Sequence, residues 1–252
     1  MTVDITHQPL LRVTDLTIGW GSHIIQQDTS FEVERGDIFV ILGRSGCGKS
    51  TLLRHLIGLA TPLRGEITID GVQPQHLLLK RPKFGVMFQS GALLGSYTVG
   101  ENVALPLMEW TRLPEDAIAA IARSKLRLVG LDGAENKLPS ELSGGMRKRA
   151  AIARAMALEP ELIFLDEPSA GLDPITAADI DELILSLNAG LNLTVVIVTH
   201  ELESIFKIGK RCIMLDKEEK RVIAAGDPRE LRTESPDPRV RAFFNRVPET
   251  ES

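Results

Sequence analysis

An apolar run, a glycine-rich loop and a second apolar run follow one another between residues 37 and 57, and this order constrains the fold most. The first run, Asp37-Ile-Phe-Val-Ile-Leu42, is typical of a strand buried on both faces. The loop Gly43-Arg-Ser-Gly-Cys-Gly-Lys49-Ser50 comes next, and the apolar stretch to Ile57 is typical of a helix. The order predicts a strand, a phosphate-binding loop and a helix of an α/β nucleotide-binding core.

The glycines of this loop let backbone N–H groups converge on phosphate oxygens, and the helix N-terminus adds its positive dipole end. We expect Lys49 to reach the β- and γ-phosphates of a nucleoside triphosphate and Ser50 to be a Mg²⁺ ligand. The residues expected to bind nucleotide here are Gly43, Arg44, Ser45, Gly46, Cys47, Gly48, Lys49, Ser50 and Thr51.

Two more apolar runs, 161–165 and 193–199, are also typical of buried strands. Between them, residues 179–188 follow the i, i+3, i+4, i+7 spacing of a helix face. The apolar positions on that face are Ile180, Leu183, Ile184 and Leu187. Together the segments predict a strand-helix-strand unit of a parallel sheet.

Polar residues directly follow both of these strands. Asp166 ends the first, Glu167 comes next, and His200 follows the second. Ligands of open α/β folds bind at the carboxyl ends of parallel strands. We expect Asp166 to hold Mg²⁺, Glu167 to polarise the attacking water as general base, and His200 to contact a γ-phosphate or position the water.

Other segments have different patterns. Residues 10–33 and 65–72 form short segments in which apolar and polar residues alternate, with turn signals between the segments. This pattern predicts an antiparallel β flap. The division expected from these patterns is a core of residues 1–89 and 158–225, a helical lobe at 90–157, and a proline-bearing, charged tail at 226–252.

Composition narrows the class of protein. With 29 Lys and Arg against 34 Asp and Glu, the 252-residue chain has a formal charge of −5 and no overall attraction for nucleic acid. Its two cysteines, Cys47 and Cys212, lie far apart without metal-ligand spacing and predict a reduced, intracellular protein. No run approaches the ~20 apolar residues that span a bilayer, so we expect another chain to supply any membrane span.

The sequence Leu142-Ser143-Gly144-Gly145-Met146 is the most specific motif of the chain. With the loop and strand residues above, it resembles the nucleotide-binding subunits of ABC transporters over nearly the whole length. The resemblance implies a P-loop NTPase (RecA-like) core with a parallel sheet, an antiparallel β flap and an inserted helical lobe, binding ATP and Mg²⁺. The resemblance implies that Trp20 stacks on adenine and that Gln89 is the Q-loop glutamine and a metal contact. Asp166 would be the Walker B aspartate and Glu167 the catalytic glutamate. Asp173 would belong to the D-loop, and His200 would be the switch histidine.

Ser143, Gly144 and Gly145 at a helix start offer a hydroxyl, backbone N–H groups and a positive dipole end, which together make a second phosphate cradle. In the family the two cradles lie at opposite ends of a protomer. The resemblance therefore implies a head-to-tail homodimer with two ATP molecules between the protomers.

Three short blocks are similar to the ATPases of MCE-type lipid-transport systems, the MlaF-like group: the signature ending in Met146, residues 88–94 and residues 166–175. That similarity implies an ATPase at the cytoplasmic face of the inner membrane that energises phospholipid transport. Its implied partners are an integral membrane permease, an MCE-domain protein and a small accessory subunit. An importer ATPase for a polar solute is the alternative.

Three segments allow more than one interpretation. Residues 90–97 are apolar and glycine-bearing, as in a groove for a permease helix, or they form a buried loop of the helical lobe. The basic run 147–149 binds phosphates or coats a helix surface, and we favour the coat. Phe243 and Phe244 dock on a second protomer or accessory subunit, or pack on their own domain.

Two rival functions are weighed against transport. An ABC protein acting in DNA repair or on ribosomes usually has a long coiled coil or two fused domains, and this chain has neither heptads nor that length. A regulatory ATP-binding module without turnover is disfavoured because Glu167 and His200 are both present.

Overall fold

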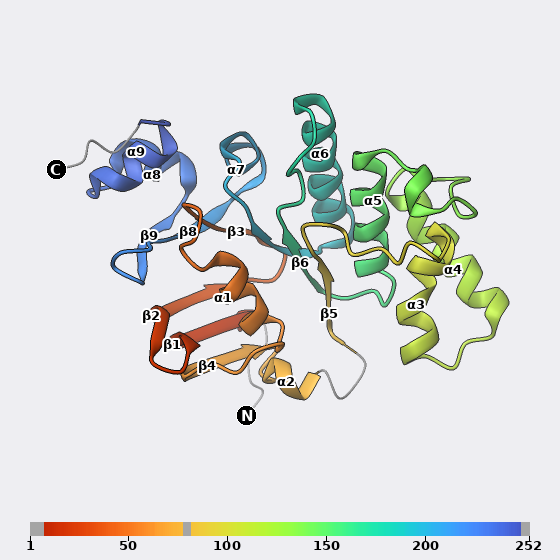
Figure 1. Ribbon diagram of the computed structural model, residues 1–252, viewed down its shortest axis with the longest axis horizontal. Helices are drawn as coiled ribbons and strands as arrows, with labels where there is room; N and C mark the ends of the chain where they lie inside the picture. Colours follow the sequence, from red (N-terminus) through yellow and green to blue (C-terminus); the bar gives the residue numbers. More distant parts are fainter. Residues whose placement is uncertain (1–7, 78–81, 248–252) are drawn as a thin grey trace. The chain divides into compact units, whose positions relative to one another are not determined.

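A computed structural model describes residues 8–77 and 82–247 of the chain (Figure 1). The chain divides into two compact units, one formed by residues 1–79 with 198–252 and the other by residues 80–197. The expected division into core, helical lobe and tail stays a prediction, and each unit is described below by itself.

The first unit contains an antiparallel sheet in the order β2-β1-β4. Its strands are β1 (Leu11–Trp20), β2 (His23–Val33) and β4 (Arg64–Ile69). Leu11 lies opposite both Val33 and Ile69, and buried and exposed residues alternate along much of β1. The predicted β flap is confirmed.

The same unit contains β3 (Ile38–Gly43), β8 (Arg211–Leu215) and β9 (Val222–Gly226) as neighbouring strands. β3 pairs parallel with β8, and β8 pairs antiparallel with β9. All six residues of β3 are buried, and five residues separate the end of the strand from α1 (Lys49–Leu56). The predicted order of strand, loop and helix at 37–57 is confirmed.

The second unit contains β5 (Phe84–Met87), β6 (Leu162–Asp166) and β7 (Thr194–Val198), with β6 between the other two. β5 and β6 are parallel, with Val86 opposite Phe164. The helix α6 (Pro174–Leu191) connects β6 to β7, and its buried residues include the four apolar positions of the predicted face. The predicted strand-helix-strand unit is confirmed, although its helix is longer than the pattern indicated.

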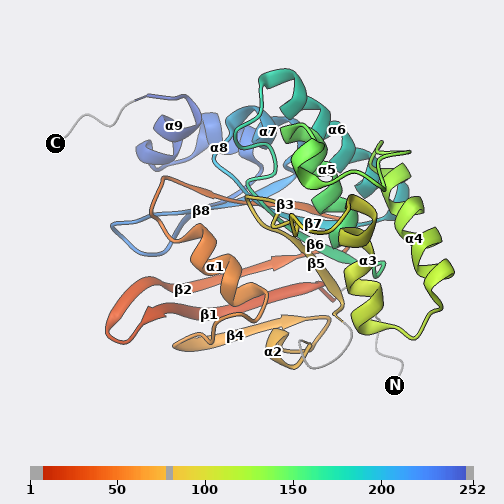
Figure 2. The same cartoon turned by 45° about the vertical axis from the view of Figure 1, so that its right-hand side comes forward.

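The remaining helices of the second unit are α3 (Val99–Trp110), α4 (Glu115–Leu128) and α5 (Gly144–Ala155), with a short 3₁₀ helix at Pro139–Glu141. Figure 2 shows α3, α4 and α5 gathered together. Thr98 and Glu101 form a capping box at the start of α3. Asn102 of that helix bonds to the backbone of Leu94, Tyr97 and Thr98, which fixes the loop before it.

The C-terminal segment folds onto the first unit. This segment contains the short helices α7 (Leu202–Ile208), α8 (Pro228–Glu234) and α9 (Pro238–Phe244). A further short helix of the first unit, α2 (Pro74–Leu77), follows β4. Phe244 is buried in a cluster with Val40, Leu42 and Val240, and its ring lies 5.6 Å from that of Phe206. Phe243 is partly buried against the same cluster. The interpretation that these rings pack on their own domain is therefore confirmed for Phe244.

Among the described residues, no helix combines the length and apolar character needed to cross a membrane.

Candidate functional site

The phosphate-binding loop of the first unit has a backbone that requires glycine. Gly43, Gly46 and Gly48 have φ of +147°, +79° and +101°, which residues with a Cβ rarely adopt. A Cβ on Gly43 would lie 2.5 Å from the Leu215 oxygen, and one on Gly48 would lie 2.4 Å from Ile25. The open backbone ahead of α1 fits the predicted phosphate cradle.

Lys49 is the first residue of α1 and is buried. Its Nζ donates to the backbone oxygens of Gly43, at 2.7 Å, and Arg44, at 3.2 Å. The ammonium is therefore held over the loop, which fits the expected contact with β- and γ-phosphates. Ser50 and Thr51 follow it on the first turn of the helix.

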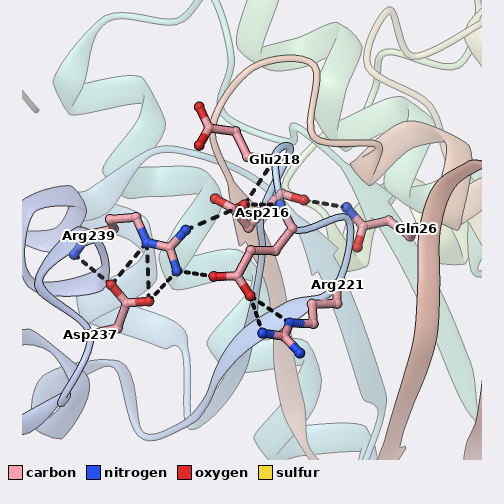
Figure 3. Close-up of polar contacts among 7 residues, drawn as sticks. Gln26, Asp216, Glu218, Arg221, Asp237 and Arg239 are labelled. Carbon is pink, nitrogen blue, oxygen red and sulfur yellow. Dashed lines mark hydrogen bonds and ion pairs between the residues drawn. The ribbon is translucent and has the colours of Figure 1, made fainter. Parts of the chain in front are cut away.

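The loop is supported from below by a glutamine on β2. Gln26 is fully buried, and its Nε2 donates to the backbone oxygen of Cys47 at 2.7 Å. The same Nε2 donates to the backbone oxygen of Asp216, also at 2.7 Å (Figure 3). The Asp216 carboxylate in turn accepts from the backbone N–H groups of Glu218 and Glu219. One amide thus joins the phosphate-binding loop to the turn between β8 and β9.

That turn is joined to the C-terminal helix by Arg239 (Figure 3). Arg239 pairs with Asp237 at 2.6 Å and with Glu219, and its Nη1 lies 3.7 Å from Asp216. The hydrogen bonds from Arg239 lower the pKa of the Asp237 and Glu219 carboxyls, and Arg221 lowers that of Glu219 further. The carboxylates raise the pKa of Arg239 itself. The cluster links residues far apart in sequence, none of which sequence reasoning selected.

Two further predicted residues lie in the first unit. Trp20 ends β1 and is 56% exposed, so its ring face is available for stacking. His200 follows β7, and its Nε2 lies 3.6 Å from the Glu201 carboxylate. Both side chains lie at the surface, as a residue that contacts nucleotide must.

The second unit holds the predicted acidic pair. Asp166 ends β6 and Glu167 follows with φ of +48°, a conformation that is uncommon outside glycine. Both are buried. The Glu167 oxygen accepts from the N–H of Ala170, which closes a turn directly after the strand.

Lys148 corrects the interpretation of the basic run 147–149 as a helix coat. It is only 8% exposed. Its Nζ donates to the backbone carbonyl oxygens of Gln89, at 2.6 Å, and Glu167, at 2.9 Å. Burial lowers the pKa of its ammonium, while the nearby Glu167 and Asp166 act in the opposite direction. Arg147 and Arg149 bond to the backbone oxygens of Leu142 and Val129. Arg147 is exposed, so the helix-coat interpretation is wrong for Lys148 and is confirmed for Arg147.

The signature residues form the start of α5. The Ser143 hydroxyl accepts from the N–H of Met146 and caps the helix. A Cβ on Gly145 would lie 2.4 Å from Thr176 Cγ2, so close packing on α6 requires glycine there. Asp173 caps α6, and its bonds to Thr176 lower the pKa of its carboxyl.

The structure thus distributes the predicted site residues over both units. The first unit carries Trp20, residues 43–51 and His200, whereas the second carries Gln89, Asp166, Glu167, Ser143, Gly144, Gly145 and Asp173. Among the described residues no cluster of three His, Cys, Asp or Glu side chains could hold a metal alone. The ligands predicted for Mg²⁺ are side-chain oxygens of Ser50, Gln89 and Asp166. Mg²⁺ prefers oxygen ligands and usually keeps several waters and phosphate oxygens besides those of the protein.

Sequence reasoning missed Gln26 and the true role of Lys148. A helical wheel of α5 could have found Lys148, because it shares a face with the buried residues Ala151, Ile152 and Ala155 at i+3, i+4 and i+7. Nothing in the local sequence distinguishes Gln26, whose partners are 21 and 190 residues away.

Residues 26–170 match the family model described as ABC transporter. The chain belongs to the ABC transporter family. It is 43% identical over 240 residues to the probable ribonucleotide transport ATP-binding protein Mkl of Mycobacterium leprae, covering 93% of this chain and 68% of the relative. It covers 66% of the Mkl of Mycobacterium bovis. The intermembrane phospholipid transport system ATP-binding protein MlaF of Escherichia coli is 42% identical over 243 residues, covering 94% of this chain and 89% of the relative.

Solved structures agree with this assignment. The CbiO1 structure from Clostridium perfringens, described as part of an ABC transporter complex, has a TM-score of 0.81 at 29% identity, covering 90% of this chain and 91% of the other. A dimeric ATP-binding cassette in a post-hydrolysis state with ADP and Pi has a TM-score of 0.76 at 31% identity, covering 86% and 98%. The chain is therefore an ABC ATPase subunit of a transporter, with the predicted P-loop α/β fold.

Proposed function

We propose that this ATPase energises phospholipid transport between two membranes. The observation that carries the proposal is the 42% identity to MlaF, which extends over 94% of this chain and 89% of the relative. The variant signature ending in Met146, which is similar to that of the MlaF-like group, supports the same assignment. The ATPase supplies conformational work, while the lipid passes through other chains.

The proposed partners follow from this function. They are an integral membrane permease, an MCE-domain protein and a small accessory subunit, with the ATPase at the cytoplasmic face of the inner membrane. The loop at 90–97 is proposed to receive the permease, because Leu94 and Tyr97 are exposed while Asn102 fixes its backbone. An exposed apolar surface on a fixed backbone is suited to binding another protein's helix.

We assign the nucleotide chemistry to both units. The glycines of the phosphate-binding loop, with Lys49, bind the phosphates, and Trp20 stacks on adenine. Glu167 accepts the proton of the attacking water, and His200 and Gln89 orient that water. When bound at Ser50, Gln89 and Asp166, Mg²⁺ neutralises the charge that develops on the phosphates.

The functional form is proposed to be a homodimer. Ser143, Gly144 and Gly145 at the start of α5 offer backbone N–H groups and a positive dipole end to the nucleotide of the second protomer. The dimeric post-hydrolysis cassette at 31% identity supports this arrangement. Two identical sites related by a two-fold axis follow from such pairing.

Turnover is tested with the Glu167→Gln variant. We expect ATP binding near the wild-type level and an ATPase rate at least about 100-fold lower, because the general base is lost. The Lys49→Ala variant is expected to weaken both binding and turnover. Wild-type turnover in the Glu167 variant would remove Glu167 from the mechanism.

The transported substrate is tested by co-purification from detergent-solubilised membranes, using an affinity-tagged chain. A permease together with an MCE-domain protein supports phospholipid transport. The Mkl relative, at 43% identity, is named for ribonucleotide transport, which favours a polar solute as the second candidate. A solute-binding protein in place of the MCE-domain protein would support that candidate and overturn the first.

A further inference from the structure

Lys148 joins the two segments that carry the proposed hydrolytic side chains. The Gln89 oxygen lies 2.6 Å from its Nζ and the Glu167 oxygen 2.9 Å away, and all three residues belong to the second unit. Both contacts are to the main chain, so they fix backbone rather than side chains.

A lysine is costly to keep at this position. Burial disfavours its charged form and lowers the pKa of the ammonium, and Glu167 and Asp166 oppose that effect. A buried cation stabilises its surroundings only when its hydrogen bonds are made. Here the two carbonyl groups provide those bonds, and they belong to the two segments proposed to hold and activate the attacking water.

The backbone of Glu167 needs such support. Its φ of +48° lies in the left-handed region, which costs free energy for a residue with a Cβ and persists only where neighbouring contacts enforce it. The bond from Lys148 and the turn bond from Ala170 N–H both end on the Glu167 oxygen. These bonds hold the carbonyl, and therefore the direction in which the Glu167 side chain leaves the backbone.

A second cation on the same helix holds the neighbouring part of the Gln89 segment. Arg154 donates to the oxygens of Gly91 and Ala92, each at 2.7 Å, and burial lowers the pKa of its guanidinium. Of these two cations on α5, Lys148 is the one that reaches Gln89 and Glu167 together.

We propose that Lys148 is a positioning residue for ATP hydrolysis, which fixes the backbone of Glu167 and Gln89 to the helix that begins at the signature motif. The inference rests on the proposed roles of Glu167 and Gln89. It adds that their geometry depends on a buried ammonium more than 18 residues away along the chain from either of them. Loss of that ammonium impairs the chemical step and leaves nucleotide binding nearly intact, because Trp20 and Lys49 belong to the other unit.

The test compares Lys148→Met with Lys125→Met in the assembled transporter. Lys125 is the matched control, since it is also 8% exposed, lies in the same unit and pairs with Glu159 at 2.9 Å, away from the assigned chemistry. We expect Lys148→Met to lower kcat about tenfold or more with the Kd for a fluorescent ATP analogue within about twofold. Lys125→Met is expected to keep kcat within about twofold, and Tm is measured for both.

Two further variants keep the test decisive. Lys148→Arg retains donors for both carbonyl groups and is expected to recover most of kcat. Lys148→Gln retains an uncharged donor, and its kcat is expected to lie between that of Lys148→Met and that of the wild type. If Lys148→Met does not fold, Lys148→Gln and Lys148→Arg still rank the contribution of the donors to kcat.

Two outcomes would overturn the inference. One is a wild-type kcat in Lys148→Met with a lowered Tm like that of Lys125→Met, which would make the lysine purely structural. The other is a loss of ATP affinity with kcat unchanged.

The Glu167→Gln variant in the same assay separates the proposed role of Glu167 from that of Lys148. If that variant turns over normally, the assignment of Glu167 fails, whereas if it stalls while Lys148→Met is normal, only the role of Lys148 fails.

Discussion

Replacing Gln26 perturbs the phosphate-binding loop from beneath. The Gln26→Leu variant removes the donor shared by the Cys47 and Asp216 backbone oxygens, both at 2.7 Å, of which the bond to Cys47 is buried and the bond to Asp216 is part-buried. Each buried carbonyl left without its partner costs about 1 to 3 kcal/mol. Within the described residues Gln26 Oε1 is itself buried without a hydrogen-bond partner, so its removal offsets about 1 to 3 kcal/mol.

The net loss expected for Gln26→Leu is therefore about 1 to 3 kcal/mol in the free energy of unfolding. For a chain of this length that corresponds to a fall in Tm of roughly 2 to 12 °C. Gln26→Glu is nearly identical in shape, but its ionised carboxylate would face two carbonyl oxygens and has no donor. We expect Gln26→Glu to be the less stable of the two, because an unpaired buried charge costs more than a missing amide.

The assay is thermal unfolding by calorimetry with and without ATP. Both variants are expected to bind ATP more weakly, since Cys47 lies in the loop that cradles the phosphates. Gln73→Leu is the control, because Gln73 lies at the surface of the same unit and its side chain donates to the Glu66 carboxylate. A Gln26→Leu protein as stable as wild type, or a Gln26→Glu protein more stable than Gln26→Leu, would refute this account of the loop.

Two further predictions concern ionisation. Arg239 holds the pKa values of Asp237 and Glu219 below their ordinary values of 3.8 and 4.5. The stabilisation that these carboxylates provide is therefore complete above the ordinary pKa values, and it is lost as the pH falls through the lowered pKa values of the folded protein. Arg239→Met should therefore flatten the acid side of a Tm-against-pH curve, and an unchanged slope would contradict the assignment. Burial raises the pKa of the Cys47 thiol from 9.0 and that of Cys212 to about 12, so iodoacetamide at pH 8 should label both far faster after unfolding than in the native protein. Equal labelling rates, measured by mass spectrometry, would rule out that protection.

The fold was largely predictable because its signals are local. The strand before Gly43, the helix after it and the apolar face of α6 each depend on periodicity within about ten residues. The signature and the acidic pair were predictable for the same reason, since each is a short contiguous motif. The register of β1 with β2 and β4 was not, because pairing partners are chosen by tertiary packing.

The residues that support the site escaped prediction for a different reason. Gln26 and Arg239 act through partners on distant segments, and their residue types are ordinary for exposed positions. Lys148 was assigned to the surface because lysine is almost never fully buried. The helical wheel of α5 could have indicated its burial, but its two backbone acceptors lie on other segments and are revealed only by the folded chain.

The helix α5 connects these observations physically. Its N-cap is Ser143, which we propose contacts the partner's nucleotide, and Lys148 follows five residues later, about 7.5 Å along the axis. Hydrogen bonds between successive turns couple the two positions, so we expect a displacement at the Ser143 end to displace the Lys148 ammonium as well. Because that ammonium is bonded to the Glu167 carbonyl, we expect closure of the second nucleotide site to displace the proposed general base of the protomer's own site. Lys148→Met should therefore weaken the dependence of the ATPase rate on dimer formation as well as the rate itself.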